Sequence, residues 1–289
     1  MYTIGIDIGG TKIKFGMFEE DGQPFKVQEI KTPKELIAES MIKTIIDMVQ
    51  ENDIQGIGVA TAGIVDYQNG IITSAANLPS LVDVPLGKML EKAFHVPVVV
   101  DNDANSGAVA EGAIGAAKTV RSFICVTIGT GIGGGIIHNN ELVHGRSGYG
   151  GEIGHMTIVP KGLPCGCGRK GCWEVYASGK ALERMISKNP YLKDYRPQDV
   201  FAKGAEKEPC KQIVKEYLEY LSIGIINLQY MFDPEMVVIG GGVIDSSTYW
   251  WDELVEKIAS TSSIPINLQQ AHLKNNASMI GANSLVKQM

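Results

Sequence analysis

Three of the five cysteines in this 289-residue chain lie within eight positions, in the segment GLPCGCGRKGCWE. The spacing C-x-C-x4-C places thiols close enough to share a metal ion, and an odd number of cysteines argues against a framework of disulfides. The nearest preceding histidine lies in GEIGHM. Three thiolates and one imidazole form the Cys3His ligand set of a structural zinc site. We therefore predict that one Zn²⁺ is bound by His155, Cys165, Cys167 and Cys172.

Two other interpretations of the cysteine cluster are open. The three thiols could be unligated, with His155 used only for a substrate, which would leave an oxidisable cluster without a purpose. A zinc hydrolase is the other alternative. It is disfavoured because four protein ligands fill the tetrahedral positions and leave none for a catalytic water.

Glycine-rich turns follow three apolar segments, in GIDIGGTK, TIGTGIGGG and VIGGGV. Glycine lets the backbone approach a phosphate group closely, and its N–H groups can then donate to the phosphate oxygens. An ordinary hairpin is the simpler interpretation of any one turn, but two matched turns that each carry a threonine favour phosphate binding. The predicted phosphate-binding residues are Gly9, Gly10, Thr11 and Lys12 in the first turn and Thr130 and Gly131 in the second.

The second turn also matches G-x-G-x-x-G, the fingerprint of dinucleotide-binding folds. That fingerprint has to open a helix, whereas here it runs into the strand-like segment GGIIHNN. The chain contains no GxxxxGK[ST] motif either. The remaining class is a phosphotransferase that holds its nucleotide with paired hairpin turns.

Acidic residues stand where phosphoryl transfer would need them, since that reaction requires a divalent cation and a carboxylate at the attacking hydroxyl. Asp7 ends the first strand and could hold Mg²⁺ through water, or could cap its own turn. The segment VVVDNDANSG lies at a junction between strand and helix, the usual ligand position in an open sheet. It is not a calcium loop, because Ser106 replaces the required glycine. We predict that Asp103 is catalytic and that Asp101 or Asn105 caps the helix.

The elements that position these residues follow from apolar periodicity. Ile4, Ile6 and Ile8 alternate before the first turn and apolar residues alternate after it, which predicts a hairpin. Thr32 and Glu35 form a capping box that predicts a helix directly after it. Further helices are predicted over PLGKMLEKAF, NSGAVAEGAIGA, residues 211–232 and the segment after residue 278. The segment SFICVTIGTGIGGGIIHNN repeats the opening pattern, so an internal duplication is expected.

Composition limits the class of protein. The chain is 44% apolar and 20% charged with a net charge of -6, so a nucleic-acid partner is not expected. No apolar run approaches about 20 residues and no signal peptide is visible, so neither a membrane span nor export is expected, and a cytoplasmic location is predicted. The length favours two domains. We predict one over 1–117 plus the C-terminal helix 272–289, and another over 118–271 with the zinc-binding loop.

The motifs DIGGTK, DNDAN, TIGTGIGGG, GEIGHM and CGCGRKGCWE stand together in one order. In these motifs the chain resembles the ROK (repressor, open reading frame, kinase) sugar kinases of the actin-like ATPase superfamily, over essentially its whole length. The resemblance implies an α/β fold of two actin-like (ribonuclease H-like) domains that flank a central cleft. It also implies a homodimer that uses ATP and Mg²⁺ to phosphorylate a hexose, usually at the 6-hydroxyl. Some members carry a DNA-binding module ahead of the kinase, but here the first motif begins at residue 7, so none is expected.

The resemblance also implies roles for individual residues. Asp103 would be the general base and Asp7 would serve the metal, while Thr11, Thr130 and Gly131 would serve the phosphates. The residues implied to contact the sugar are Asn77, Asn102, Asp103, Glu152, His155 and Glu174. Those implied to approach the adenosine are Gly240 and Gly241.

The identity of the sugar is left open by one departure from the family pattern. Ala62 precedes Gly63 where many members have proline, in a loop that borders the sugar in the family. Glucose is the leading candidate because GCWEVYASG looks most like glucokinase members. N-acetylmannosamine is the runner-up, and fructose and mannose are further alternatives. A non-catalytic sugar-binding protein would need Asp103 to be idle.

Overall fold

The computed structural model describes residues 2–19, 22–50 and 52–288. The chain forms two compact units. Unit 1 comprises Met1–Thr119, Gly135–Gly151 and Asn275–Met289, and unit 2 comprises Val120–Gly134 and Glu152–Lys274. The domain boundaries derived from the sequence, after residues 117 and 271, stay a prediction.

The first sheet has the strand order β3-β2-β1-β4-β7. The predicted hairpin is confirmed: β1 and β2 pair antiparallel, and β4 runs parallel to both β1 and β7. A small ladder of β5 and β6 follows β4 in the chain. The bounds are β1 Tyr2–Ile8, β2 Lys12–Phe18, β3 Pro24–Lys31, β4 Ile54–Thr61, β5 Ile64–Asp66, β6 Ile71–Ser74 and β7 Val98–Asn102.

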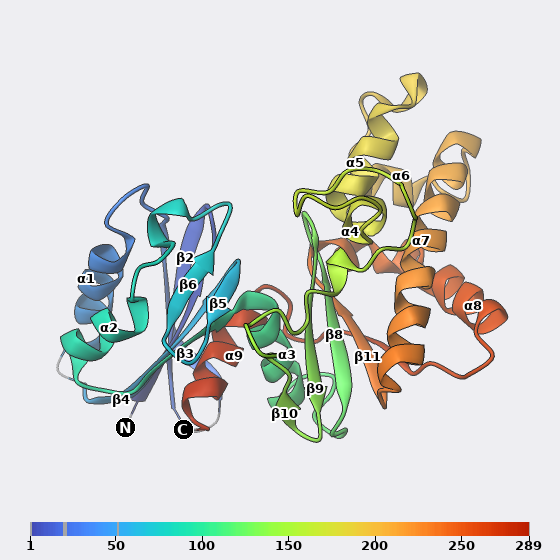
Figure 1. Cartoon of the computed structure of the whole chain (residues 1–289). Coiled ribbons are helices and arrows are strands. Elements are labelled where there is room, and N and C mark those ends of the chain that lie inside the picture. The colour runs from blue at the N-terminus through green and yellow to red at the C-terminus, as the bar shows by residue number, and fades with distance from the viewer. Residues whose placement is uncertain (1, 20–21, 51, 289) are drawn as a thin grey trace. The chain divides into compact units, whose positions relative to one another are not determined.

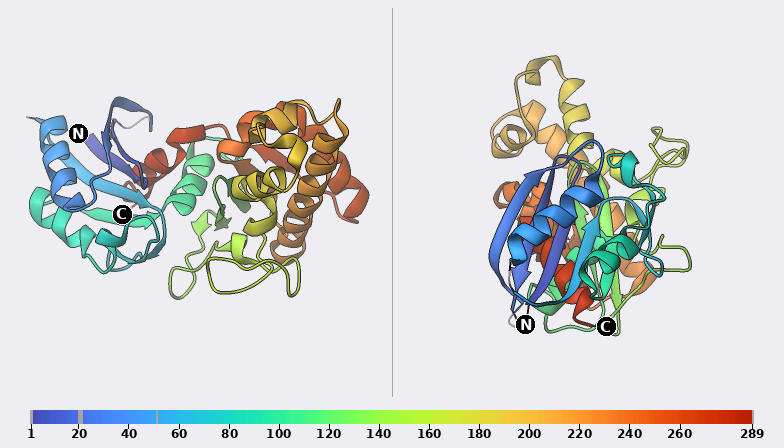
Figure 2. Two further views of the ribbon diagram at one scale, coloured as in Figure 1. Left: turned by 90° about the horizontal axis from the view of Figure 1, so that it is seen from above. Right: turned by 90° about the vertical axis from the view of Figure 1, so that its left-hand side faces the viewer.

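Helices cover both faces of this sheet (Figure 1). The alternating isoleucines of β1 are buried on the face covered by α1 and α2, which lie together in both views of Figure 2. On the other face, glycines let α9 approach the strands. A Cβ atom on Gly5 would lie 2.3 Å from the carbonyl oxygen of Met279, and one on Gly58 would lie 1.8 Å from that of Ala282. The helices are α1 Ile37–Val49, α2 Leu86–Phe94, α3 Asp103–Ala113 and α9 Ala277–Val286, with short 3-10 turns η1 Pro79–Leu81 and η5 Lys274–Asn276.

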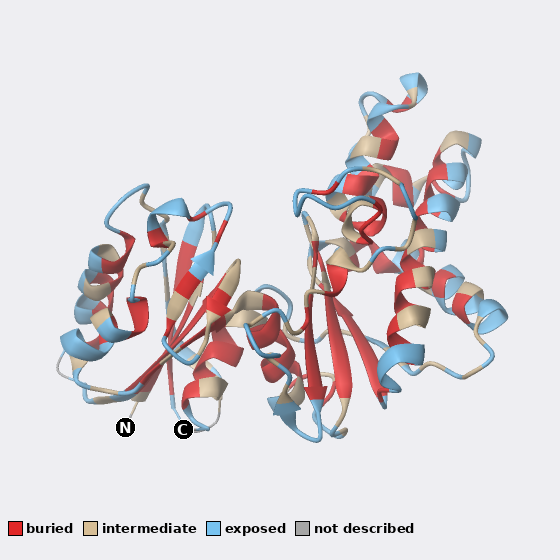
Figure 3. Cartoon of the chain, in the orientation of Figure 1, coloured by how far each residue is buried: buried red, intermediate tan, exposed pale blue. Residues whose placement is uncertain are grey.

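The second sheet repeats the first in its order, β10-β9-β8-β11-β12, with β8, β11 and β12 parallel. In each sheet, two further parallel strands lie beside the first strand of a hairpin. The predicted duplication is thereby confirmed. Strands β8, β9 and β11 are almost wholly buried (Figure 3). The bounds are β8 Phe123–Ile128, β9 Ile132–His138, β10 Glu141–Leu142, β11 Met236–Gly240 and β12 Leu268–Gln270.

The long helix α7 anchors the helical part of unit 2. Trp173 is fully buried, its indole N–H donates to the carbonyl of Tyr220 at 2.9 Å, and its ring fills the space beside Gly224. The Tyr217 hydroxyl donates to the carbonyl of Ala177 at 2.8 Å. Both contacts fix the short helix α4 against α7. The elements are α4 Glu174–Ala177, α5 Gly179–Ser187, α6 Pro197–Ala202, α7 Glu208–Phe232 and α8 Trp251–Thr261, with η2 Ile153–His155, η3 Pro190–Leu192 and η4 Gly242–Tyr249.

One predicted helix start is wrong. The capping box of Thr32 and Glu35 does not form, because α1 begins only at Ile37, after Leu36 in a left-handed conformation with φ 55°. The Thr32 hydroxyl instead donates to the carbonyl of Gly9 at 2.7 Å. A local motif has been overridden here by a contact with the first glycine turn.

Among residues 2–19, 22–50 and 52–288, no helix combines the length and the apolar character needed to cross a membrane.

Candidate active site and metal centre

The turn between β1 and β2 carries the first set of predicted phosphate residues. The Gly9 N–H donates to the carbonyl of Lys12 at 3.0 Å, and Thr32 holds the carbonyl of Gly9 from the end of β3. Lys12 forms an exposed ion pair with Glu29 at 2.9 Å. Thr11 is exposed. The backbone of this turn is therefore held by hydrogen bonds, while its threonine is exposed.

Asp7 lies in a charged setting at the base of the same turn. It stands opposite Lys14 in the register of β1 and β2. Burial raises the pKa of the Asp7 carboxyl, and the neighbouring ammonium groups of Lys14 and Lys12 oppose that rise. Lys14 is itself buried, and its Nζ donates to the carbonyl of Asn275 at 2.5 Å. A carboxylate that is partly desolvated here would be stabilised by a divalent cation, so Asp7 fits the predicted Mg²⁺ role.

Asn77 lies beside this turn. A Cβ atom on Gly10 would be 3.1 Å from the Cβ atom of Asn77, and both residues are exposed. A predicted sugar contact and a predicted phosphate contact are therefore neighbours within unit 1.

The acidic segment lies where β7 ends and α3 begins. Asn102 is the N-cap, since its side-chain oxygen accepts the N–H groups of Ala104 at 2.8 Å and Asn105 at 3.1 Å. The expectation that Asp101 or Asn105 caps this helix is wrong. The Asp101 carboxylate instead forms hydrogen bonds with the side chains of Asn105 and His144. Asp103 is the first residue of α3 and is partly exposed.

The second glycine turn, between β8 and β9, is braced by the start of α5. The Gly179 N–H donates to the carbonyl of Gly129 at 2.8 Å, and the Lys180 N–H donates to that of Thr130 at 3.4 Å. Across the turn, the Gly129 N–H donates to the carbonyl of Gly131 at 3.0 Å. Thr130 is exposed, as Thr11 is in the first turn.

The glycines implied to approach the adenosine lie at the end of β11. Gly240 pairs with Thr127 of β8, two residues before the second turn begins. Gly241 has φ 88°, and a Cβ atom there would lie 2.4 Å from the carbonyl of Ile128. Only glycine suits this position, which places the two glycines beside the strand that leads into the second turn.

A short hairpin-like loop presents the cysteines. The Gly171 N–H donates to the carbonyl of Leu163 at 2.8 Å, and the Cys165 N–H donates to that of Arg169 at 2.9 Å. Gly168 and Gly171 have positive φ angles, 84° and 81°, so the chain can reverse within a few residues. This reversal brings the three thiols to one side of the loop.

The four predicted zinc ligands come together. Their ligand atoms all lie within 4.8 Å of one another. The Cys165 Sγ is 3.6 Å from Nδ1 of His155, and the Cys167 Sγ is 3.6 Å from that of Cys172. In a tetrahedral site with Zn–S bonds of about 2.3 Å, neighbouring sulfurs lie about 3.8 Å apart. Burial raises the pKa of the Cys165 thiol to about 12, so its thiolate would need a cation such as Zn²⁺ beside it. The residues present fit zinc.

The carboxylates of Glu152 and Glu174, which are predicted to contact the sugar, flank the histidine of this cluster. The distance from His155 Nε2 to Glu152 Oε2 is 3.7 Å, and that from His155 Nδ1 to Glu174 Oε1 is also 3.7 Å. Burial raises the pKa of Glu152, an effect that His155 opposes and Glu174 reinforces. The Cys165 thiol donates to Glu174 Oε1 at 3.1 Å, and a Cβ atom on Gly131 would lie 2.5 Å from Glu174 Oε2. Glu174 therefore touches both the cysteine cluster and the second turn.

The predicted residues fall into two groups, one in each unit. Unit 1 contains Asp7, Gly9, Gly10, Thr11, Lys12, Asn77, Asn102 and Asp103. Unit 2 contains Thr130, Gly131, Glu152, His155, Cys165, Cys167, Cys172, Glu174, Gly240 and Gly241.

Sequence reasoning missed three residues near these groups. Lys14 could have been found, because the alternation of the predicted hairpin places it opposite Asp7. Thr32 was assigned to a helix cap. His144 carried no signal, since its contact with Asp101, at 2.6 Å, joins residues 43 positions apart.

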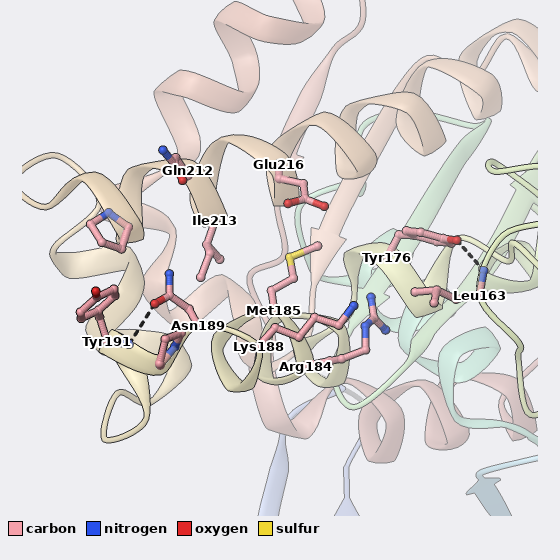
Figure 4. Close-up of a pocket in the computed structure, with 12 residues that line it drawn as sticks. Leu163, Tyr176, Arg184, Met185, Lys188, Asn189, Tyr191, Gln212, Ile213 and Glu216 are labelled. Atoms are coloured by element: carbon pink, nitrogen blue, oxygen red, sulfur yellow. Dashed lines mark hydrogen bonds between the residues drawn. The ribbon is translucent and has the colours of Figure 1, made fainter.

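A separate cavity of about 580 Å³ lies in unit 2 between α5 and α7 (Figure 4). Tyr176, Arg184, Lys188 and Glu216 are among the side chains that line it. None of its lining residues is a predicted site residue. The Tyr176 hydroxyl accepts the N–H of Leu163 at 2.6 Å, so the wall of the cavity also supports the start of the cysteine loop.

Comparison with known proteins decides the family. The family model described as "ROK family" matches residues 3–289. The chain belongs to the ROK family. The glucokinase of Streptomyces coelicolor is 34% identical to this ROK protein, over 99% of this chain and 98% of its own length.

Two solved structures are similar over 100% of both chains. The ROK hexokinase from Thermus thermophilus is 34% identical with a TM-score of 0.87. A ROK family glucokinase from Streptomyces griseus, in complex with glucose and AMPPNP, is 31% identical with a TM-score of 0.83. The predicted α/β, two-domain actin-like fold is thereby confirmed.

Proposed function

We propose that this ROK protein transfers the γ-phosphoryl group of ATP to the 6-hydroxyl of a hexose, with glucose as the leading substrate. Full-length similarity to a glucokinase and to a glucokinase bound to glucose and AMPPNP supports the proposal. The observation in this chain that carries it is the position of Asp103. This carboxylate is the first residue of α3, at the carboxyl end of β7, where open α/β sheets bind their ligands.

In the proposed reaction the 6-hydroxyl oxygen attacks the γ-phosphorus. The bond between that phosphorus and the oxygen bridging to the β-phosphate breaks, and ADP leaves. The hydroxyl proton passes to the carboxylate of Asp103. Because the hydroxyl loses its proton late in a loose transition state, Asp103 mainly orients the attacking oxygen.

The glycine turns supply the phosphate contacts in this proposal. Backbone N–H groups and the exposed hydroxyls of Thr11 and Thr130 would hold the phosphates, and Gly240 and Gly241 would admit the adenosine. Mg²⁺ would neutralise charge on the phosphates, and Asp7 would hold it through water.

Zinc would give the sugar-binding side chains a fixed frame. The Nδ1 of His155 lies 3.6 Å from the Cys165 Sγ and would bind the metal, which leaves Nε2 for the sugar. Glu152 and Glu174 would accept sugar hydroxyls on either side of this ring. Asn77 and Asn102 are the sugar contacts proposed from unit 1.

Substrate, assembly and location are proposed with alternatives. Ala62 leaves N-acetylmannosamine, mannose and fructose as competing substrates, and sugar binding without catalysis is the alternative class. A homodimer, a cytoplasmic location and the domain boundaries at 117 and 272 are proposed from the sequence and the family resemblance.

A coupled assay of ADP release tests the proposal. The purified protein is supplied with ATP, Mg²⁺ and, in turn, glucose, mannose, fructose, N-acetylglucosamine and N-acetylmannosamine. We expect glucose to give the highest kcat/KM. Activity with none of the five sugars would refute the proposed function, and sugar binding without ADP release would favour the non-catalytic alternative.

A further inference from the structure

The carboxylate of Asp101 is buried directly beside the proposed catalytic segment. Only 2% of the residue is exposed. Its Oδ1 accepts the backbone N–H of Asn102 at 2.7 Å and the side-chain amide of Asn105 at 3.0 Å. Its Oδ2 is 2.6 Å from Nε2 of His144. Because a carboxylate only accepts hydrogen bonds, Nε2 is the donor in this pair.

A second contact fixes the ring of His144. The ring stacks on that of Tyr67, with a centroid separation of 3.8 Å and an interplanar angle of 11°. Tyr67 directly follows β5, and a Cβ atom on Gly148 would lie 2.3 Å from the carbonyl of Val65. The loop that carries His144 therefore packs against β5 at more than one point.

The same cluster reaches the loop in which this chain departs from the family pattern. The side-chain amide of Asn102 donates to the carbonyl of Gly63 at 2.9 Å, while its oxygen caps α3. Three segments distant in sequence, at residues 63–67, 101–105 and 144–148, are thus joined through Asp101 and Asn102. All of them belong to unit 1.

We propose that His144 is a positioning residue for phosphoryl transfer, clamped between Asp101 and Tyr67. It holds the end of β7 and the first turn of α3, and thereby sets the direction of the Asp103 carboxylate. This role rests on the proposed kinase function. His144 touches none of the reacting atoms in this scheme and acts only through Asp101.

The energetic reason is the cost of a buried charge. A desolvated carboxylate that loses a partner is strongly destabilised and turns toward other donors. The donors nearest to Asp101 belong to Asn102 and Asn105, which build the first turn of α3. Displacement of a reacting group by about 1 Å lowers turnover by up to about 100-fold.

Two substitutions at one position separate the hydrogen bond from the stack. His144→Phe keeps a ring on Tyr67 but removes the donor, whereas His144→Gln keeps a donor and removes the ring. We expect kcat to fall by roughly tenfold or more in His144→Phe and to remain within about threefold of the unmodified value in His144→Gln. The KM for ATP should change by less than about twofold in both variants. His138→Phe, at an exposed histidine on β9, is the matched control and should leave kcat unchanged.

Coupling between the two partners gives a second test. Asp101→Asn and His144→Phe both remove the hydrogen bond between these two side chains. If His144 acts through Asp101, the double variant should therefore have the same kcat as the less active of the two single variants. Losses that multiply would overturn the proposal, as would unchanged kcat in His144→Phe or equal losses in His144→Phe and His144→Gln. Failure of the kinase function would appear separately, as a lack of ADP release by the unmodified protein.

Discussion

The two units hold their polar site residues by different means. In unit 1, Asp7, Asn102 and Asp103 lie at the ends of regular strands and at a capped helix. In unit 2, Glu152 and Glu174 lie beside a 3-10 turn and in a four-residue helix. Backbone hydrogen bonds fix the first group. The second group lies beside the cysteine cluster, where the proposed zinc would cross-link the segments of Glu152 and Glu174 in addition to their backbone hydrogen bonds.

The duplicated turns differ in the same way. The first turn carries charge, with Asp7 opposite Lys14 and an ion pair at Lys12. The second is neutral at the corresponding positions, and the backbone of α5 supports it. The two copies therefore share a hairpin with a glycine turn, while their side chains differ, because only the first turn carries charged residues.

The largest expected effect is that of Asp103→Asn. The substitution leaves the helix start intact but removes the group that accepts the hydroxyl proton, so kcat should fall by about 100-fold or more. The KM for the sugar should change little. Asp252→Asn, in the exposed first turn of α8, is the matched control. A near-normal kcat in Asp103→Asn would place the base elsewhere.

Removal of zinc tests the frame in unit 2. Cys167→Ser should lose the metal, lower thermal stability and raise the sugar KM by at least about tenfold, or about 1.4 kcal/mol of binding free energy. The KM for ATP should change much less. Cys210→Ala removes a thiol outside the cluster and should retain zinc by elemental analysis. An active Cys167→Ser protein with no zinc and an unchanged sugar KM would contradict the cross-link.

Two glycines of one turn should give different kinetic effects. A methyl group on Gly131 would press on the Glu174 carboxylate at 2.5 Å, whereas one on Gly129 would meet nothing within 4 Å. Gly131→Ala should therefore raise the sugar KM by roughly three- to tenfold, and Gly129→Ala should leave it within about twofold. Steady-state kinetics with sugar and ATP varied separately measures the difference. Equal effects of the two substitutions on the sugar KM would show that contact between Gly131 and Glu174 does not affect sugar binding.

The smallest expected effect concerns the charge of Asp7. Because burial raises its pKa, the ionised carboxyl destabilises the folded state at pH values above the raised pKa, and this penalty disappears as the pH falls toward the ordinary value of 3.8. Without nucleotide and Mg²⁺, Asp7→Asn should unfold at a higher denaturant concentration at pH 7, with a gain below about 2 kcal/mol. The gain should shrink as the pH approaches 4. A variant less stable at pH 7 would show that Lys14 and Lys12 outweigh burial.

Local sequence patterns predicted those parts of the molecule whose structure depends on residues close to one another in the sequence. The alternation of Ile4, Ile6 and Ile8 predicted β1, and the spacing of the cysteines with a nearby histidine predicted the metal cluster. The helix cap was assigned to Asp101 or Asn105 because any of these side chains can cap. In the structure Asn102 caps the helix and Asp101 instead contacts His144, a contact between distant residues that no local pattern reveals.

The central claim is that the chain transfers phosphate from ATP to a hexose with Asp103 as the base. Phosphorus NMR of a reaction with glucose, ATP and Mg²⁺ follows both products directly. We expect glucose 6-phosphate and ADP to accumulate in equal amounts with the unmodified protein, and neither to accumulate at a comparable rate with Asp103→Asn. Release of ADP and inorganic phosphate without a sugar phosphate, or equal rates for the two proteins, would contradict the account.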